Sequence, residues 1–454
     1  MGSYNVDPMT DSSVVDAFIR GATVPMTGGY ESGALDEAEA LRSTHPDITR
    51  ATIHAAAVAG DLEGVRGFVT ADPSHASRKG GPYDWDPLTY LCFSRYLRVQ
   101  RSRSKHFVSV AAALLDAGAN PNTGWHESHH HWESAIYGAA GVGRDPALTR
   151  LLLERGADPN DEETPYHVIE SYDNTTLLIL LESGKLNADS LATVLLRKAD
   201  WHDFEGIWLA LHHGADVNAR TRWGGRTALH QALLRDNRLS IVTLLLDSGA
   251  DPTIECEIGV APAVASRRGR GDVFDLFDRR GIRWHLHGVD ALLAACARDD
   301  QAQVRQITAT DPPAVAAVTR DGAALGAFAG VGNVKGVRQL LGLGVAVDAI
   351  WKEGDGYYGT ASDSTALHVA AWRLQHDVVA LLLEHGANAN AVDGRGRTPL
   401  ALTVHACVDS YWSGRRSPES AEMLLHAGAS LDGVRYPSGY DEVDQLLRAA
   451  GARL

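Results

Sequence analysis

Two groups of side chains in this 454-residue chain could do chemistry, and the first lies in GWHESHHHWES, residues 124–134. Here His126, Glu127 and His130 match the zinc-peptidase pattern H-E-x-x-H. That pattern holds zinc when it lies on a helix, because the i and i+4 spacing places both imidazoles on one face. The stretch instead follows Ala-Asn-Pro-Asn and precedes a helical pattern, so we expect a hairpin tip. We predict a solvated projection, with no metal and no other cofactor. A looser metal site that uses His126 and His130 is the alternative.

The second group combines a phenol, two carboxylates and an imidazole, from Tyr172, Asp173, Asp200 and His202, with Trp201 beside them. A histidine next to a carboxylate can do general acid–base work, because the carboxylate tunes the pKa of the imidazole. These residues end two consecutive helical stretches, and packed helices lie about 10 Å apart, so they could share one pocket. We expect a structural or binding role. A small-ligand pocket and a catalytic site are the alternatives.

Other motifs of catalysis or nucleotide binding are absent from the sequence, including the P-loop and the nucleophile elbow. The Gly/Arg-rich stretch RRGRGD, residues 267–272, fills a turn between two helical patterns and follows no strand, so we predict no phosphate loop there. The formal charge of −15 disfavours nucleic-acid binding, because phosphate contacts need clustered cations. One local exception, RYLRVQRSRSK at residues 95–105, is interpreted as a solvated insertion.

The composition is that of a folded, soluble protein, with 44% apolar and 22% charged residues. No apolar run approaches the roughly 20 residues of a membrane-spanning helix, and the N-terminus has no secretory pattern. Cys92, Cys256, Cys296 and Cys407 lie far apart, which is typical of buried thiols in a reducing compartment. We therefore expect a cytoplasmic monomer that binds no membrane.

Short apolar runs that end in glycine recur between Gly118 and Gly428, at an average spacing of about 34 residues. A second helical stretch precedes each run. A helix pair of this kind exposes an apolar face that it cannot bury alone, so neighbouring pairs must stack into one long core. The glycine suits the left-handed residue that ends the second helix.

These repeats resemble the ankyrin repeat. Its T-P-L-H position is occupied at residues 164–167, 227–230 and 365–368, and its G-A-[DN]-x-N ending stands nearly intact at 118–122, 156–160, 214–218 and 386–390. The resemblance covers roughly residues 50–435 and implies an all-α solenoid of about eleven helix-pair units, with hairpin tips and terminal caps. The stretches KADWHDFEG and ACVDSYWSGRRSPES also look like those of a bacterial subfamily.

The resemblance further implies that the threonine hydroxyl and the histidine ring at the T-P-L-H position hydrogen-bond the backbone. His54, His167, His230 and His368 are therefore expected to be structural.

The expected domains are a tail and capping helix at 1–45, an N-terminal stack at 46–285, a C-terminal stack at 286–435 and a C-terminal cap at 436–454. The seam is placed there because residues 299–320 lack the repeat ending. The N-terminal capping helix is predicted at 34–43 and the C-terminal one at 440–450.

Insertions at residues 94–107, 123–134, 351–364 and 410–416 lengthen turns and hairpin tips with aromatic and basic residues. In the ankyrin family, hairpin tips and inner helices line a concave groove that holds partners. Aromatic side chains there suit interface anchors, because they offer a large contact area with a polar handle. The expected binding residues are Trp85, Trp125, His126, Trp132, Tyr137, Trp201, Trp223, Arg235, Trp351, Tyr357 and Tyr358.

We therefore expect a binding module that takes a protein or peptide partner in its concave groove. The chain's acidic residues favour a basic partner. The alternative is an enzyme or small-molecule binder whose pocket lies in the concave face of repeats 2–6, around Tyr172, Asp173, Asp200 and His202. Acid–base or metal-assisted chemistry would then be expected, but the balance favours a protein that is not an enzyme.

Overall fold

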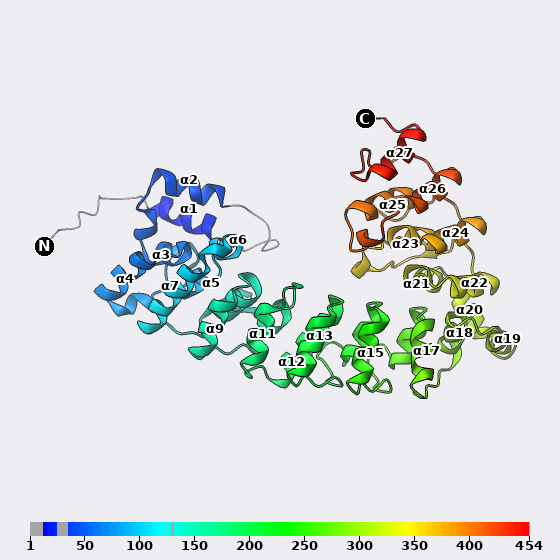
Figure 1. The fold of residues 1–454 in the computed structure, drawn as a ribbon, viewed down its shortest axis with the longest axis horizontal. Helices are drawn as coiled ribbons and strands as arrows, with labels where there is room; N and C mark the ends of the chain where they lie inside the picture. Colours follow the sequence, from blue (N-terminus) through cyan, green and yellow to red (C-terminus); the bar gives the residue numbers. More distant parts are fainter. Residues whose placement is uncertain (1–11, 25–34, 129–130, 454) are drawn as a thin grey trace. The chain divides into compact units, whose positions relative to one another are not determined.

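The computed structural model describes residues 12–24, 35–128 and 131–453 (Figure 1). Within these ranges the regular structure is helical apart from two small two-stranded sheets. The chain divides into two compact units, residues 1–221 and 222–454, which we call unit 1 and unit 2. Each unit is a stack of helix pairs, and each is described by itself.

Unit 1 is built mainly of α-helices. They are α1 (Ser12–Ala22), α2 (Asp36–Thr44), α3 (Ile53–Ala59), α4 (Leu62–Ala71), α5 (Pro87–Cys92), α6 (Arg95–Val99), α7 (Ser104–Asp116), α8 (Ala135–Tyr137), α9 (Pro146–Glu154), α10 (Glu163–His167), α11 (Thr175–Glu182), α12 (Ala188–Asp200) and α13 (Phe204–His212). Strands β1 (Gly124–Ser128) and β2 (His131–Ser134) form an antiparallel hairpin in which Trp125 pairs with Glu133 and His126 with Trp132.

Unit 2 continues with α14 (Ala228–Leu234), α15 (Leu239–Asp247), α16 (Ala261–Arg267), α17 (Gly271–Arg279), α18 (Gly288–Ala297), α19 (Gln301–Thr310), α20 (Pro312–Thr319), α21 (Ala323–Val331), α22 (Val334–Gly342), α23 (Ala366–Trp372), α24 (His376–Glu384), α25 (Pro399–Val408), α26 (Glu419–His426) and α27 (Asp441–Ala449). Strands β3 (Ile350–Trp351) and β4 (Ser364–Thr365) pair at the base of the 351–364 insertion, with Ile350 opposite Thr365.

The pair α23–α24 shows why the sequence folds into this unit. Thr365 caps α23, and its hydroxyl accepts a hydrogen bond from the His368 N–H while His368 Nδ1 accepts one from the Thr365 N–H. Leu367 of α23 and Leu382 of α24 are fully buried, because α23 packs between α21 and α25. Gly386 follows the second helix at φ +82°, a conformation that a side chain would strain.

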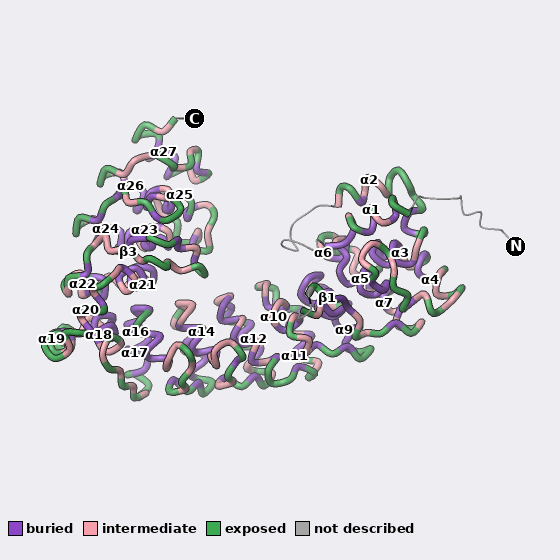
Figure 2. Tube along the Cα trace, turned by 180° about the vertical axis from the view of Figure 1, so that it is seen from behind, coloured by how far each residue is buried: buried purple, intermediate pink, exposed green. Residues whose placement is uncertain are grey.

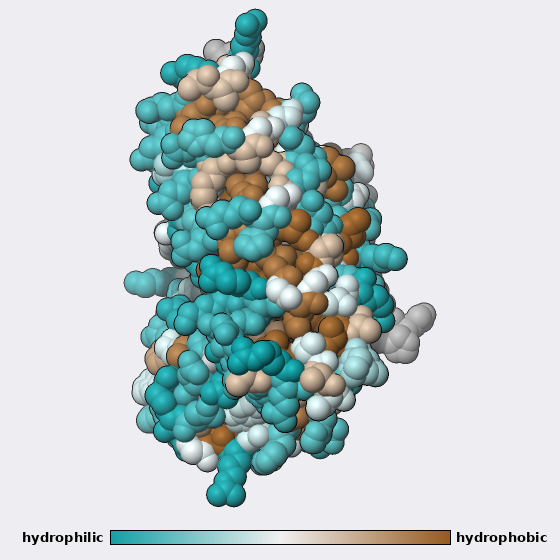
Figure 3. All heavy atoms as spheres, turned by 90° about the vertical axis from the view of Figure 1, so that its right-hand side faces the viewer, coloured by the Kyte–Doolittle hydropathy of each residue, from teal (hydrophilic) through white to brown (hydrophobic). Residues whose placement is uncertain are grey.

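The core of each unit runs along the inside of its helix pairs, where buried segments recur from one pair to the next (Figure 2). Each fully buried leucine contributes roughly 1.5–3 kcal/mol relative to an exposed one. A single pair cannot bury that surface, so the stability of each pair depends on its neighbours. Half-buried apolar residues of the outer helices, such as Leu341, Leu383 and Leu425, pack against this core. The outer side of unit 2 shows apolar residues as a broken band among hydrophilic ones (Figure 3).

The termini and one repeat depart from the regular pair. Helix α2 lies where the N-terminal capping helix is predicted, and α27 lies where the C-terminal one is. Helix α1 falls in the segment that we assigned to a tail, yet it buries Val15, Phe18, Ile19 and Ala22. Three helices, α18, α19 and α20, stand where other repeats have two, in the region that lacks the repeat ending. Helices α16 and α18 pack against each other within unit 2. The stack boundaries expected from the sequence stay a prediction.

Among the described residues, no single helix is both long enough and apolar enough to span a membrane. Helices α20 and α21 together have the length and composition of a span, but they are bent by 72° relative to each other.

Candidate functional site: a cationic cleft in unit 2

The turns that join inner to outer helices in unit 2 share one backbone geometry. In each of these turns one residue adopts a positive φ, between +46° and +77°: Asp236 after α14, Gly269 after α16, Gly332 after α21 and Leu374 after α23. The N–H of the next residue then bonds back to a carbonyl five positions earlier, which closes the inner helix. Because the geometry repeats, the side chains that follow these residues come to the same level of the stack.

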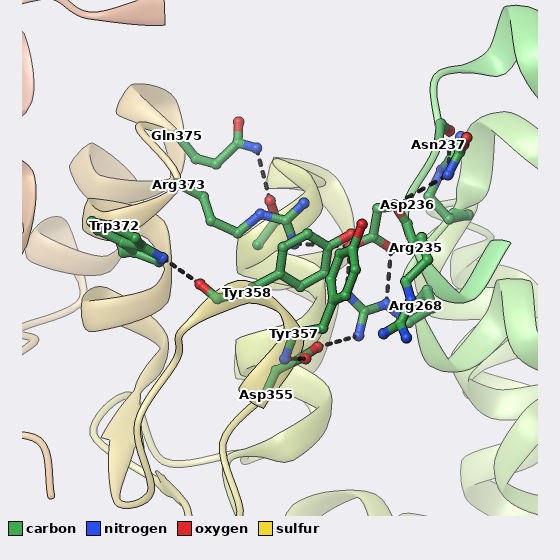
Figure 4. A network of polar contacts seen from close by, with 12 residues as sticks. Arg235, Asp236, Asn237, Arg268, Asp355, Tyr357, Tyr358, Trp372, Arg373 and Gln375 are labelled. Atoms are coloured by element: carbon green, nitrogen blue, oxygen red, sulfur yellow. Dashed lines mark hydrogen bonds and ion pairs between the residues drawn. The ribbon is translucent and has the colours of Figure 1, made fainter. Parts of the chain in front are cut away.

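A buried ion-pair cluster, which we call the Asp236 cluster, joins three of these turns, those after α14, α16 and α23 (Figure 4). Arg268 donates through Nε to Asp236 Oδ1 at 2.8 Å and through Nη2 to Oδ2, and Arg373 Nη1 donates to Oδ2 at 2.8 Å. The side chains of Asp236, Arg268 and Arg373 are only 3%, 10% and 7% exposed. Burial alone would raise the pKa of Asp236, but the two guanidinium groups hold it well below its usual value.

The 351–364 insertion completes this cluster. Asp355 accepts a hydrogen bond from Arg268 Nη1 at 3.1 Å. Tyr357 and Tyr358 follow, with the guanidinium of Arg235 lying 3.8 Å from the centre of the Tyr357 ring and that of Arg373 lying 4.1 Å from the Tyr358 ring. Tyr358 is 7% exposed, whereas Tyr357 is 40% exposed. The insertion therefore folds back onto the inner helices of its own unit.

A cleft of about 450 Å³ lies beside the Asp236 cluster. Its walls are the inner-to-outer turns of the α14–α15, α16–α17, α21–α22 and α23–α24 pairs, together with Arg298 after α18 and Arg415 after α25. The lining contains six basic side chains, Arg238, Arg270, Arg298, Lys335, Arg373 and Arg415, and three acidic ones, Asp236, Asp272 and Asp275. The formal excess of three positive charges contrasts with the −15 of the whole chain.

Three of these cations are already engaged with acidic residues. Arg270 is buried, with 5% of its surface exposed, and its Nε and Nη2 atoms each donate a hydrogen bond of 2.8 Å to Asp272. Arg298 pairs with Asp278 at 2.6 Å, and Arg373 is held by the Asp236 cluster.

The other three cations of the lining have no such partner. Within the described residues, no carboxylate lies within 4.0 Å of the basic groups of Arg238, Lys335 or Arg415. Arg238 and Lys335 are exposed, so they are free to contact a ligand. Partial burial, and then the positive charge of Arg373, lower the pKa of Arg415. The cleft thus has a net positive charge, and three of its basic side chains have no acidic partner among the described residues.

Unit 1 has a second charged cluster, around His167. Its Nε2 lies 3.1 Å from Glu163 and its Nδ1 lies 3.1 Å from Glu170. Glu170 also pairs with Arg197, which pairs in turn with Asp200. Burial opposes the charged imidazolium, but the two carboxylates outweigh it and raise the pKa of His167 to about 9. His167 thus bonds carboxylates, unlike His54 and His368 in similar positions, whose Nε2 atoms lie 2.8 Å and 3.0 Å from the backbone carbonyls of residues 78 and 391.

Two tryptophans expected as binding anchors are buried in unit 1. Trp85 and Trp125 are 5% and 8% exposed, and their rings stack with centroids 5.0 Å apart. Phe93 packs against Trp125, and Tyr137 packs against Phe93. Tyr137 is 1% exposed. These side chains form an aromatic core beneath the hairpin and offer a partner little surface.

The H-E-x-x-H match lies on the hairpin and not on a helix. His126 and Glu127 belong to strand β1, which excludes the helical geometry of a zinc-peptidase site. The His126 ring contacts the half-buried Trp132 across the hairpin, with centroids 4.6 Å apart. His130 lies outside the described residues, so the looser metal site stays a prediction.

The expected acid–base group is brought together only in part. The Tyr172 ring meets Trp201 edge-on, with centroids 5.8 Å apart. Asp173 accepts a hydrogen bond from the Thr175 N–H in its own turn, and Asp200 pairs with Arg197 at 2.6 Å. His202 adopts φ +51° in the turn after α12. The two carboxylates thus stabilise local structure, and a catalytic role for the group stays a prediction.

The remaining expected anchors are half-buried. The guanidinium of Arg222 lies 4.9 Å from the centre of the Trp223 ring. Trp351 packs on α21 so closely that a side chain at Gly326 would meet its ring at 2.8 Å.

Sequence reasoning missed the basic residues of the cleft. It recognised RRGRGD as a turn, which is correct, but it discarded the stretch because no strand precedes it. The available signal was positional: RDNR at 235–238, RRGR at 267–270 and RLQ at 373–375 all fall where an inner helix ends and before the next outer helix begins. Arginine that recurs at one position of stacked repeats indicates a charged surface.

Two family models match parts of this chain and agree with its helix-pair architecture. Residues 136–256 match a family model of three ankyrin repeats, and residues 362–394 match a single ankyrin repeat. Tyrosine-protein kinase HTK16 of Hydra vulgaris is 36% identical over 78 residues, which are 15% of this chain and 10% of that protein, so the chain spans about a tenth of that relative's length. The human ASB11 ankyrin repeat domain matches at 21% identity over 51% of this chain and 96% of that one, with a TM-score of 0.24. The family-model matches and the stacked helix pairs together show that this chain contains ankyrin repeats and folds as an all-α ankyrin solenoid; ankyrin repeats generally mediate protein–protein interaction.

Proposed function

We propose that this protein is a binding module that holds an acidic segment of a partner protein in the cationic cleft of unit 2. The observation that carries the proposal is the excess of three positive charges in that cleft, within a chain of formal charge −15. A cleft of opposite sign to its surroundings focuses the field on one site and selects a partner of complementary charge. The charge of the cleft therefore favours an acidic partner over the basic one expected from the overall composition.

Aromatic residues next to the cleft support the same role. Tyr357 and Tyr411 are 40% and 60% exposed, on insertions whose neighbouring residues are packed. Tyrosine provides contact area at low entropic cost and is enriched at binding sites. A partner segment in the cleft would lie within reach of both the cations and these rings.

The test is quantitative capture from a cell extract with the wild type and with Arg238→Glu/Lys335→Glu. Both residues are exposed, so the variant should fold normally. The matched control is Arg279→Glu/Arg338→Glu, which makes the same charge change at exposed positions outside the cleft. We expect the cleft variant to lose proteins that the wild type and the control retain. An identical captured set from all three would refute the proposal.

The alternative of an enzyme in repeats 2–6 has weaker support. The carboxylates expected to do acid–base work are engaged with their own turn or with Arg197. The monomeric state and the cytoplasmic location remain predictions; burial of Cys92, Cys296 and Cys407 is consistent with thiols that stay reduced.

A further inference from the structure

We propose that the cationic cleft of unit 2 recognises a phosphoryl group on the partner, as carried by a phosphorylated serine or threonine. This inference rests on the proposed function and specifies the chemistry of the partner. A phosphoryl group carries about −1.5 to −2 charges and three acceptor oxygens, whereas a carboxylate carries one charge and two oxygens. The excess of three positive charges around about 450 Å³ therefore matches the phosphoryl group better.

The cleft also collects the N-terminal ends of outer helices. Helices α15, α17, α22 and α24 each have nine residues, and the turn before each one lines the cleft. Helix N-termini attract anions, because their N–H groups and dipoles point outward. Four such ends facing one cavity add to the field of the side chains.

The capping residues differ between the two units in a way that favours an added anion. In unit 1 the outer helices α4, α9 and α13 begin with Asp61, Asp145 and Asp203, whose carboxylates accept hydrogen bonds from the first turn. In unit 2 the same position before α15 and α17 holds Arg238 and Arg270, and neither side chain caps its helix. Gln375 before α24 makes no cap either, whereas Asn333 caps α22. At α15 and α17 of unit 2, an arginine thus stands where an aspartate caps α4, α9 and α13 of unit 1.

The cations are arranged to bind a compact anion. Arg238, Lys335 and Arg415 have no acidic partner among the described residues, and they come from three different repeats around the opening. Arg373 lies deeper and is 6% exposed, and its Nε is buried without a hydrogen-bond partner in the described part of the chain. Arginine forks bind phosphoryl oxygens in a bidentate way.

The acidic residues of the lining do not cancel this field. Asp236 is shared by Arg268 and Arg373, Asp272 is held by Arg270, and Asp275 lies 4.0 Å from Nε of Arg298. The overall charge of −15 would repel an extended polyanion such as a nucleic acid, so a single phosphoryl group on a peptide is favoured.

The experiment measures binding of three nonapeptides of alternating Gly and Ser to the full chain by calorimetry. The central residue is Ser, Glu or phosphoserine, and inorganic phosphate is the fourth probe. We expect the phosphoserine peptide to bind at least tenfold more tightly than the Glu peptide and than inorganic phosphate. Arg238→Glu/Lys335→Glu should weaken that binding at least tenfold, and Arg279→Glu/Arg338→Glu should leave it unchanged. Equal affinity for the phosphoserine and Glu peptides, or for phosphoserine peptide and inorganic phosphate, would overturn the inference.

A phosphatase arm separates this inference from the proposed function. The extract used for capture is treated with phosphatase before incubation with the wild type. Loss of the cleft-dependent proteins supports phosphoryl recognition. Retention of those proteins, with their loss only in Arg238→Glu/Lys335→Glu, refutes phosphoryl recognition while the proposed function stands. Failure of the cleft variant to lose any protein refutes both.

Discussion

Replacing Asp236 by asparagine removes the charge at the centre of the Asp236 cluster while it keeps the shape of the side chain. Asp236 sits at φ +46°, and asparagine tolerates this left-handed conformation as well as aspartate does. The change therefore tests the ion pairs without adding backbone strain. It leaves the buried guanidinium of Arg373 without its carboxylate, whereas Arg268 keeps Asp355 at 3.1 Å.

The magnitude follows from the burial of the three groups. At an effective dielectric constant of about 20, one charge pair at about 4 Å is worth about 4 kcal/mol, so two arginines contribute roughly 8 kcal/mol before desolvation. Desolvation of each ion offsets several kcal/mol of this. Removal of one partner from a buried pair lowers the free energy of unfolding by about 3–5 kcal/mol. Because Arg268 keeps its contact with Asp355, we expect a loss of stability near the lower end, about 3 kcal/mol. For a unit of this size that is a fall in melting temperature of roughly 6–12 °C.

The assay is urea unfolding followed by circular dichroism, with hydrogen exchange of residues 355–373 to localise the effect. The control is Asp247→Asn, which breaks an ion pair with Arg280 in the same unit. That pair is exposed, with side chains 59% and 27% accessible, so solvent screens it and the unfolding curve should overlay that of the wild type. If Asp236→Asn had the midpoint and the exchange rates of the wild type, the cluster would not hold the insertion.

Three further changes test other parts of the reasoning. The pKa of His167 is about 9 in the folded protein, above its value of about 6.5 in the unfolded chain. Protonated His167 therefore adds at most about 3 kcal/mol to the free energy of unfolding; this contribution is fully present below pH 6.5 and is lost as the pH rises through 9. His167→Gln should therefore lower the melting temperature strongly at pH 6 and little at pH 9.5, and a difference independent of pH would contradict the ion pairs. Trp125→Ala should destabilise unit 1 by about 3–5 kcal/mol in urea unfolding, because it leaves a cavity in the aromatic core; a change below about 1 kcal/mol would mean that the ring is an exposed anchor after all. Gly269→Ala should lower the melting temperature of unit 2, because φ is +69° and the added Cβ would lie 2.6 Å from a Phe328 ring carbon. An unchanged melting temperature would show that this turn is not constrained.

Much of the fold was predictable, because the repeat pattern is local. The T-P-L-H position predicted the capping contacts of His230 and His368, and both form with the threonine three residues earlier. The same pattern misled at His167, whose ring contacts carboxylates and not the corner backbone. Helix α1 was missed although Val15, Phe18 and Ile19 have helical spacing, because the surrounding residues suggested a tail.

The candidate site was predicted less well than the fold. The sequence predicts exposed aromatic anchors at Trp85 and in the insertions, but Trp85, Trp125 and Tyr358 are buried. An insertion rich in aromatic residues can bind a partner or pack on its own repeats, and composition does not distinguish the two. Burial decides between these outcomes, and it depends on how far each insertion reaches across its neighbours.

The sequence by itself determined the repeating unit: the helix pairs, their caps, the glycines that end them and the apolar stripe that forces them to stack. These follow from contacts between residues a few positions apart, and they recur in most of the pairs. Only the tertiary structure decided which turns face each other, and it placed Arg373 on Asp236 across 137 residues. That choice depends on the small rotation that accumulates from one pair to the next and on the three-helix repeat between them. The charge of the cleft is therefore a property of the stack, and no single repeat contains it.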